Sequence, residues 1–151
     1  MEKKPNPYAS DPPDLKPSLV CFADVLGWTR RTEQAFKQGK AVELLRQARS
    51  ALSAAYDGIR DLGKAYWGED TKHHEVKTFS DNIVIGMPIM EWSTRGTQRD
   101  LGFLLDGLSI LQLQLASKGF FIRGGVAVRN HRMDQDFVYG SALLEAARQD
   151  E

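Results

Sequence analysis

The sequence has one cysteine, no long apolar stretch and no excess of either charge. Its 151 residues include 20 Lys and Arg and 20 Asp and Glu, so its formal net charge is zero. This balance gives no overall attraction to nucleic acid or to an anionic membrane. The lone Cys21 excludes an internal disulfide and a cysteine-rich zinc site, and its apolar neighbours indicate a buried thiol. No apolar run reaches the roughly 18 residues that a membrane span needs, and prolines interrupt the N-terminus where a signal peptide would be apolar. We expect a cytoplasmic protein without membrane or nucleic-acid partners.

The composition favours a single globular domain. A chain of this length with 42% hydrophobic residues is long enough to bury one real core. Five of the six prolines lie within residues 1–17, among polar residues. Because proline cannot sustain a helix or a central strand, we predict a flexible arm over residues 1–17. The domain itself is predicted to span residues 18–151.

The apolar spacing predicts a mixed chain of strands and helices. A long amphipathic helix is expected over residues 32–62, ending near Gly63, and a second leucine stripe follows at residues 101–115. The strand-like runs are residues 18–24, 74–80, 83–87, 120–128 and 137–139, and a further helix covers residues 142–148. The pair Asp81-Asn82 is expected to form the turn of a hairpin between the second and third strands.

The order of these elements predicts the α+β class with a ferredoxin-like βαββαβ core. Right-handed crossovers would place the first strand in the centre of an antiparallel sheet, with the two long helices packed on one face. The end of the first strand then lies beside the hairpin turn. Asp24 and Asp81 occupy those two places.

Two neighbouring carboxylates suggest a cation site. Adjacent strands are about 4.8 Å apart, so Asp24 and Asp81 would repel each other unless a cation lay between them. Mg²⁺ and Mn²⁺ prefer such oxygen ligands together with substrate phosphates. The alternative is that Asp81 is a turn residue and Asp24 a strand-end residue bonded to nearby backbone N–H groups.

Four segments resemble the class III nucleotidyl cyclases, the adenylate and guanylate cyclases. Residues 22–29 (FADVLGWT) resemble their first metal-binding segment, and residues 77–81 (KTFSD) resemble the second. Residues 123–128 (RGGVAV) and 138–148 (VYGSALLEAAR) resemble a later strand and the glycine-to-helix segment. The similarity covers residues 18–151 in matching order. Related domains continue past the final helix, so the resemblance implies a domain that is C-terminally incomplete here.

The resemblance implies a metal-dependent site. Asp24 and Asp81 would bind two divalent metal ions, Mg²⁺ or Mn²⁺, with the Val25 carbonyl as a further ligand. Lys77 would read the base; the alternative is an ordinary exposed strand lysine. Arg148 would stabilise the transition state, or else be an ordinary surface arginine.

The resemblance also implies how phosphates and subunits are arranged. The backbone N–H groups of Leu26, Gly27 and Trp28 would cradle the phosphates of a nucleoside triphosphate, as expected at the start of a helix. In this family the active sites form across a head-to-tail homodimer, with metal and arginine from different subunits. A homodimer is therefore implied.

Two positions depart from the purine-specific pattern. The base-reading aspartate of the family is Phe137 here, and its asparagine before the arginine is Leu144. Loss of a hydrogen-bonding partner weakens selection of a purine. The sequence is most similar to the pyrimidine cyclases of bacterial anti-phage (Pycsar) defence, which implies conversion of UTP or CTP to the 3′,5′-cyclic monophosphate and pyrophosphate. A separate effector protein would read the product. The alternatives are a catalytically silent nucleotide-binding module and a cyclase that accepts ATP or GTP.

Overall fold

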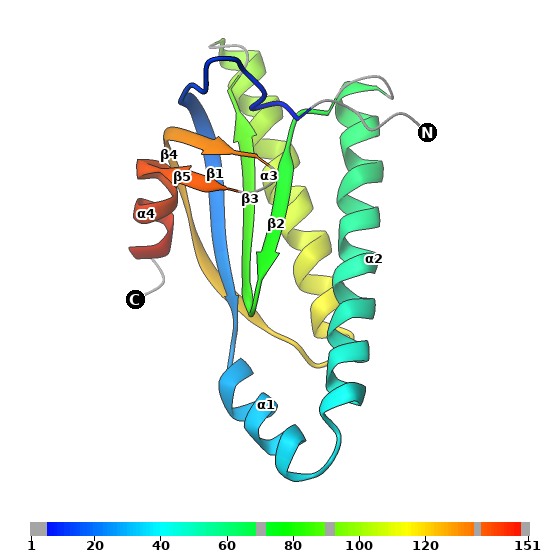
Figure 1. The fold of residues 1–151 in the computed structure, drawn as a ribbon. Coiled ribbons are helices and arrows are strands. Elements are labelled where there is room, and N and C mark those ends of the chain that lie inside the picture. The colour runs from blue at the N-terminus through cyan, green and yellow to red at the C-terminus, as the bar shows by residue number, and fades with distance from the viewer. Residues whose placement is uncertain (1–5, 69–71, 90–92, 135–136, 149–151) are drawn as a thin grey trace.

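The described part of the chain forms one antiparallel sheet with helices on both of its faces (Figure 1). The computed structural model describes residues 6–68, 72–89, 93–134 and 137–148. Residues 1–5 of the predicted arm and 149–151 of the predicted domain lie outside this part. The elements in chain order are β1 (Lys16–Val25), α1 (Trp28–Lys37), α2 (Ala41–Trp67), β2 (Glu75–Phe79), β3 (Asn82–Pro88), α3 (Thr94–Ala116), β4 (Ile122–Met133), β5 (Val138–Gly140) and α4 (Ser141–Arg148).

The sheet topology confirms the predicted fold class. The strand order is β2-β3-β1-β4-β5, and every neighbouring pair is antiparallel. β1 is therefore the central strand, between β3 and β4, as a ferredoxin-like βαββαβ core requires. The register sets Asp24 opposite Asn82 on β3 and Arg123 on β4. The C-terminal end of β1 thus meets both the hairpin turn and the start of β4.

The main core lies between the sheet and the two long helices. Alternate residues of β1, from Leu19 to Val25, point to this side together with Ile83, Ile85 and Met87 of β3. They pack against α2 and α3 through small and large apolar residues such as Ala55 and Leu111, which are fully buried. Cys21 belongs to this core, and its burial raises the pKa of the thiol to about 12. The predicted buried thiol is confirmed.

The opposite face of the sheet carries α4 and the N-terminal segment. We call residues 6–15 the arm segment. Its Tyr8 is fully buried and packs in a second cluster with Val20, Val84, Met133 and Ala142. The Lys16 ammonium also donates to the Pro7 carbonyl at 2.8 Å. Residues 6–15 of the predicted arm are therefore held against the sheet, because the Tyr8 side chain among the prolines packs into an apolar site there.

The helix predicted over residues 32–62 is in fact two helices. α1 ends at Lys37, Gly39 adopts a left-handed backbone with φ of 67°, and α2 begins at Ala41. The Lys40 N–H donates back to the Ala35 carbonyl at 2.7 Å, which is the bond of a glycine-terminated helix end. At the other end, α2 continues past Gly63, which is buried against α3 and His74, and stops at Trp67. Tertiary packing outweighs the low helix propensity of that glycine.

The hairpin turn is displaced by one residue from its predicted place. The turn residues are Ser80 and Asp81, and the positive φ of 56° belongs to Ser80. Asn82 instead pairs with Phe79 as the first residue of β3. The sequence pattern fixed the hairpin but not its register, because asparagine and serine both tolerate a turn.

β4 is longer than predicted and approaches β1 closely. A Cβ atom at Gly124 would lie 2.1 Å from the Phe22 carbonyl oxygen, so only glycine allows this contact. At its far end β4 bends over the sheet. The bend brings the Met133 sulfur to within 3.2 Å of where a Cβ at Gly86 on β3 would lie. No helix of the described residues is both long and apolar enough to cross a bilayer.

Candidate functional site

The structure brings Asp24 and Asp81 next to each other. The Val25 N–H donates to the Asp81 carbonyl at 3.0 Å, so the residue after Asp24 is bonded directly to the turn that carries Asp81. Alternation along β1 points Asp24 to the face opposite α2 and α3, the face that Val20 and Phe22 share. Within the described residues, the Asp81 carboxylate makes no hydrogen bond or ion pair.

Asp24 forms an ion pair with Arg123. The Arg123 Nε donates to Asp24 Oδ1 at 3.2 Å, and the two side chains are 55% and 21% exposed. The sequence analysis quoted Arg123 within a motif but gave it no role. The register between β1 and β4 places the Arg123 charge beside Asp24, and this register cannot be read from the sequence.

The donor set suits a hard divalent cation. Two carboxylates and the Val25 carbonyl offer oxygen atoms only, which is the chemistry that Mg²⁺ and Mn²⁺ prefer. The described residues contain no group of three or more His, Cys, Asp or Glu side chains that could hold a metal ion by themselves. The remaining ligands of such an ion would therefore come from water or from substrate phosphates.

The start of α1 presents backbone donors near the same strand end. Gly27 is the N-cap with φ of 68°, and no side chain caps the helix. The Leu26 N–H donates to the Phe121 carbonyl at 2.8 Å, so it is not available for the predicted phosphate cradle. Within the described residues, the Gly27 and Trp28 N–H groups donate no hydrogen bond. The predicted cradle is therefore reduced to these two groups and the helix N-terminus behind them.

Trp28 fixes the direction of this helix. Its ring packs in the main core and against Phe120, with ring centroids 6.2 Å apart. The Arg31 guanidinium lies over the same Phe120 ring at 4.2 Å and donates to the Gly119 carbonyl. α1 is therefore tied to the loop before β4, and its N-terminus stays at the end of β1.

Lys77 and Phe137 come from the two edge regions of the sheet. Val76 points into the main core, so Lys77 points to the other face, where its partner Val84 packs with Met133. The bend of β4 carries Met133 over β3, which brings the start of β5 back across the sheet (Figure 1). Phe137 is 56% exposed there.

Arg148 is exposed at the end of α4. This helix packs on the same face as Asp24, through Ala142 and Leu143 in the cluster with Val20. An ion pair of 2.8 Å between Arg129 and Glu145 also joins α4 to β4. Among the described residues no hydrogen bond or ion pair joins Arg148 to Asp24 or Asp81. The structure thus brings the predicted metal and phosphate residues together at the end of β1, whereas the Arg148 side chain makes no hydrogen bond or ion pair among the described residues.

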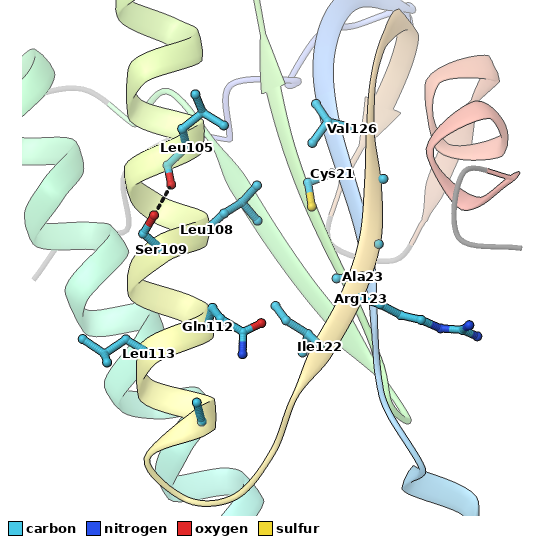
Figure 2. A pocket seen from close by; sticks show the side chains of 13 residues that line it. Cys21, Ala23, Leu105, Leu108, Ser109, Gln112, Leu113, Ile122, Arg123 and Val126 are labelled. Atoms are coloured by element: carbon cyan, nitrogen blue, oxygen red, sulfur yellow. Dashed lines mark hydrogen bonds between the residues drawn. The ribbon is translucent and has the colours of Figure 1, made fainter.

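A separate hollow lies on the other side of the sheet. It is an apolar groove of about 660 Å³ between α3 and β4, lined by side chains such as Leu105, Leu108 and Ile122 (Figure 2). Arg123 borders it, but its side chain points away from the groove. The predicted site residues Asp24 and Asp81 do not line this groove, so it is a separate feature.

The fold is that of a nucleotidyl cyclase catalytic domain. The chain matches the guanylyl cyclase domain of the RhoGC fusion protein of the aquatic fungus Blastocladiella emersonii with a TM-score of 0.55. The match has 12% sequence identity and covers 91% of this chain and 74% of the fungal domain, which is described as dimeric. The guanylate cyclase domain of RhGC from Catenaria anguillulae, solved in complex with GTP, matches with a TM-score of 0.54, 13% identity and the same coverage.

Similarity at this level of identity establishes the shared fold. No protein-family model matches the sequence, and no curated protein matches it either. The predicted fold class, an α+β fold of the cyclase type, is therefore confirmed. Activity, substrate and subunit arrangement are proposals that the site must support.

Proposed function

We propose that this protein is a metal-dependent nucleotidyl cyclase that acts on a nucleoside triphosphate. The observation that carries the proposal is the bonded contact between the end of β1 and the hairpin turn, which sets Asp24 beside Asp81 on a cyclase-type fold. Two carboxylates at the end of paired strands, one of them already next to a cation, are arranged to neutralise positive charge rather than to fill a core.

Asp24, Asp81 and the Val25 carbonyl would hold one or two divalent ions. When bound, such ions supply Lewis-acid activation of the ribose 3′-hydroxyl and charge neutralisation of the leaving pyrophosphate. Asp24 would bind an ion in exchange for its contact with the exposed Arg123 side chain. The Asp81 carboxylate has no hydrogen bond or ion pair among the described residues, so it would lose none. The rigid strand and turn backbones fix where both carboxylates project.

The triphosphate would lie against the start of α1. The Gly27 and Trp28 N–H groups and the positive end of the helix dipole favour phosphate oxygens. Arg123 adds a planar guanidinium on the adjacent strand, which suits phosphate recognition once Asp24 is engaged by metal. These groups would hold the α-phosphate in line with the attacking hydroxyl and its leaving group.

We infer that the base is a pyrimidine, uracil or cytosine. Lys77 supplies one charged donor on the substrate face, while Phe137 and Leu144 offer apolar, exposed side chains in place of purine-reading polar groups. The products would be cyclic UMP or cyclic CMP and pyrophosphate. A cytoplasmic second-messenger role in antiviral defence, with a separate effector that reads the product, follows from the resemblance to pyrimidine cyclases.

A homodimer would complete the site. Arg148 lies at the exposed end of α4, and its side chain makes no hydrogen bond or ion pair among the described residues. We therefore infer that it contacts the phosphate of a nucleotide bound by a second copy of the chain. Its planar cation would then stabilise charge on the transferring phosphate from across the interface. The Blastocladiella domain is described as a non-canonical dimer, which supports self-association of a domain with this fold.

The test is incubation with Mn²⁺ and UTP, CTP, ATP or GTP, followed by mass spectrometry for cyclic monophosphates. Asp24→Asn and Asp81→Asn should each lower the yield at least about a hundredfold, as loss of an electrostatic transition-state contact does. The matched control is Asp57→Asn, which removes an exposed carboxylate of α2 that pairs with Arg60. Its yield should match that of the parent.

Each other outcome has a definite meaning. Cyclic AMP or cyclic GMP as the main product would replace the pyrimidine assignment by a purine cyclase. Triphosphate binding without any product, measured by calorimetry, would leave a silent nucleotide-binding module. Full activity in both aspartate variants would refute the metal site.

A further inference from the structure

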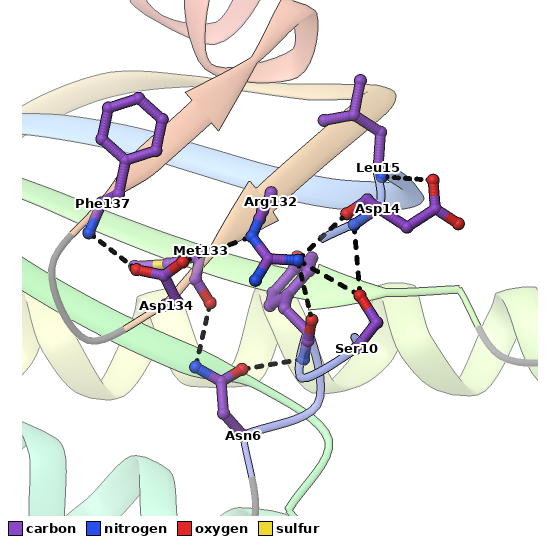
Figure 3. A network of polar contacts seen from close by, with 9 residues as sticks. Asn6, Ser10, Asp14, Leu15, Arg132, Met133, Asp134 and Phe137 are labelled. Carbon is purple, nitrogen blue, oxygen red and sulfur yellow. Dashed lines mark hydrogen bonds and ion pairs between the residues drawn. The ribbon is translucent and has the colours of Figure 1, made fainter. Parts of the chain in front are cut away.

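A continuous polar network connects the arm segment to the start of β5 (Figure 3). Arg132, near the end of β4, is at its centre and is only 15% exposed. Its guanidinium Nη1 donates to the Ser10 hydroxyl at 3.2 Å, and to the Asp14 and Tyr8 carbonyls at 3.4 and 3.5 Å. The arm segment thus supplies three acceptors to one arginine, and Tyr8 anchors the segment itself in the cluster on the sheet.

The same arginine holds Asp134. The Arg132 Nε donates to Asp134 Oδ2 at 3.2 Å. The other carboxylate oxygen, Oδ1, accepts the Phe137 N–H at 2.9 Å, and the Asp134 N–H donates to the Phe137 carbonyl at 2.9 Å. Both backbone polar groups of Phe137 are therefore fixed by Asp134, and one of the two contacts depends on the orientation of its carboxylate.

Among the described residues, the Phe137 ring has one aromatic contact. It stacks on Tyr139, with centroids 5.8 Å apart and planes 13° apart, and Tyr139 is itself 58% exposed. Neither ring belongs to the apolar clusters of the described residues. The direction in which Phe137 projects is consequently set by its backbone.

We propose that Arg132 and Asp134 are positioning residues of the nucleobase subsite, which hold Phe137 in place and thereby set the base preference. The arm segment is the anchor that orients Arg132. This inference rests on the proposed function, in which Phe137 faces the base. Small displacements of such a residue are costly, because a shift of about 1 Å in a positioning contact changes catalytic efficiency by up to about a hundredfold.

Two variants test the network at two of its residues. Asp134→Ala removes both carboxylate oxygens that accept from Arg132 and Phe137 but leaves the contacts of Arg132 with the arm segment, so the fold is expected to survive. Arg132→Lys keeps the charge but loses the planar fork that serves several acceptors at once. The matched control is Lys16→Met, which removes a bond between the arm segment and β1 that does not reach Phe137.

The first measurement is amide hydrogen exchange at Phe137, which needs no activity. Exchange should be faster in Asp134→Ala and in Arg132→Lys than in the parent or in Lys16→Met. The second is kcat and KM for the four triphosphates. Both variants should raise KM for the preferred base and reduce the ratio of kcat/KM between preferred and disfavoured bases about tenfold or more, with a smaller effect on kcat.

The outcomes separate the two proposals. Unchanged exchange at Phe137, or faster exchange with unchanged base preference, overturns the positioning role while leaving the cyclase intact. A parent protein that converts none of the four triphosphates overturns the proposed function, and the claim about base preference with it. Faster exchange together with lost preference in both variants, and neither change in Lys16→Met, supports the inference.

Discussion

Replacement of Arg123 by glutamine should tighten metal binding and weaken catalysis. The Arg123 Nε lies 3.2 Å from Asp24 Oδ1, so the guanidinium would compete with a metal ion for that oxygen. The pair is partly exposed, so its contribution is about 0.2 to 1 kcal/mol. Removal of that competition should lower the dissociation constant for Mn²⁺ by up to about fivefold, since 1.4 kcal/mol corresponds to about tenfold. Loss of a phosphate-binding cation should at the same time raise KM for the triphosphate.

The two opposite effects make this prediction easy to refute. Mn²⁺ binding is measured by electron paramagnetic resonance without nucleotide, and turnover is measured separately by mass spectrometry. Arg60→Gln removes one positive charge from the exposed surface of α2 and controls for net charge. Weaker or unchanged Mn²⁺ binding in Arg123→Gln, relative to that control, would show that Arg123 does not compete with a metal ion for Asp24. Unchanged KM would remove Arg123 from the phosphate site.

Three further predictions concern stability. Burial lowers the pKa of the fully buried His131 from 6.5 to about 4, so the unfolded chain takes up a proton at this residue at a higher pH than the folded chain does. The free energy of unfolding should therefore fall by on the order of 3 kcal/mol as the pH drops from about 6.5 to 4. Urea titrations at several pH values should show a smaller fall in His131→Gln. Gly124→Ala should cost several kcal/mol, on the order of a severe core defect, because its Cβ would meet the backbone of Phe22, and a thermal melt that is unchanged would contradict this close approach. Gly58→Ala should cost less than Gly124→Ala in the same melt, because its Cβ would meet a side-chain methyl of Ile110 at 2.7 Å rather than backbone, and because alanine favours the helix.

Much of the fold follows from local patterns in the sequence. The alternation of apolar residues around Cys21 and the leucine stripe of α3 identified a buried strand and an amphipathic helix, and the order of elements led to the correct sheet topology. The helix break at Gly39 and the hairpin turn at Ser80 were missed. At both places several residue types satisfy the local geometry, and contacts with distant elements decide which of them is used.

The candidate site was predictable in part. Asp24 was identified because a carboxylate is costly at the end of an apolar strand, and Asp81 because the predicted topology sets the hairpin turn beside that strand end. Arg123 received no role because its importance depends on the register between β1 and β4. The use of the Leu26 N–H by Phe121 likewise depends on a residue almost a hundred positions away in the chain.

The sequence by itself determined the class of the fold, the pair of carboxylates and the apolar character of Phe137. These features follow from residue type and short-range spacing, which act within one element or between consecutive ones. Only the tertiary structure decided that the proline-rich arm segment folds back on the sheet, that Arg123 accompanies Asp24, and that Arg132 links the arm segment to Phe137 through Asp134. Each of these contacts joins residues far apart in the chain, and such contacts depend on strand register, bend and burial, which no local pattern encodes.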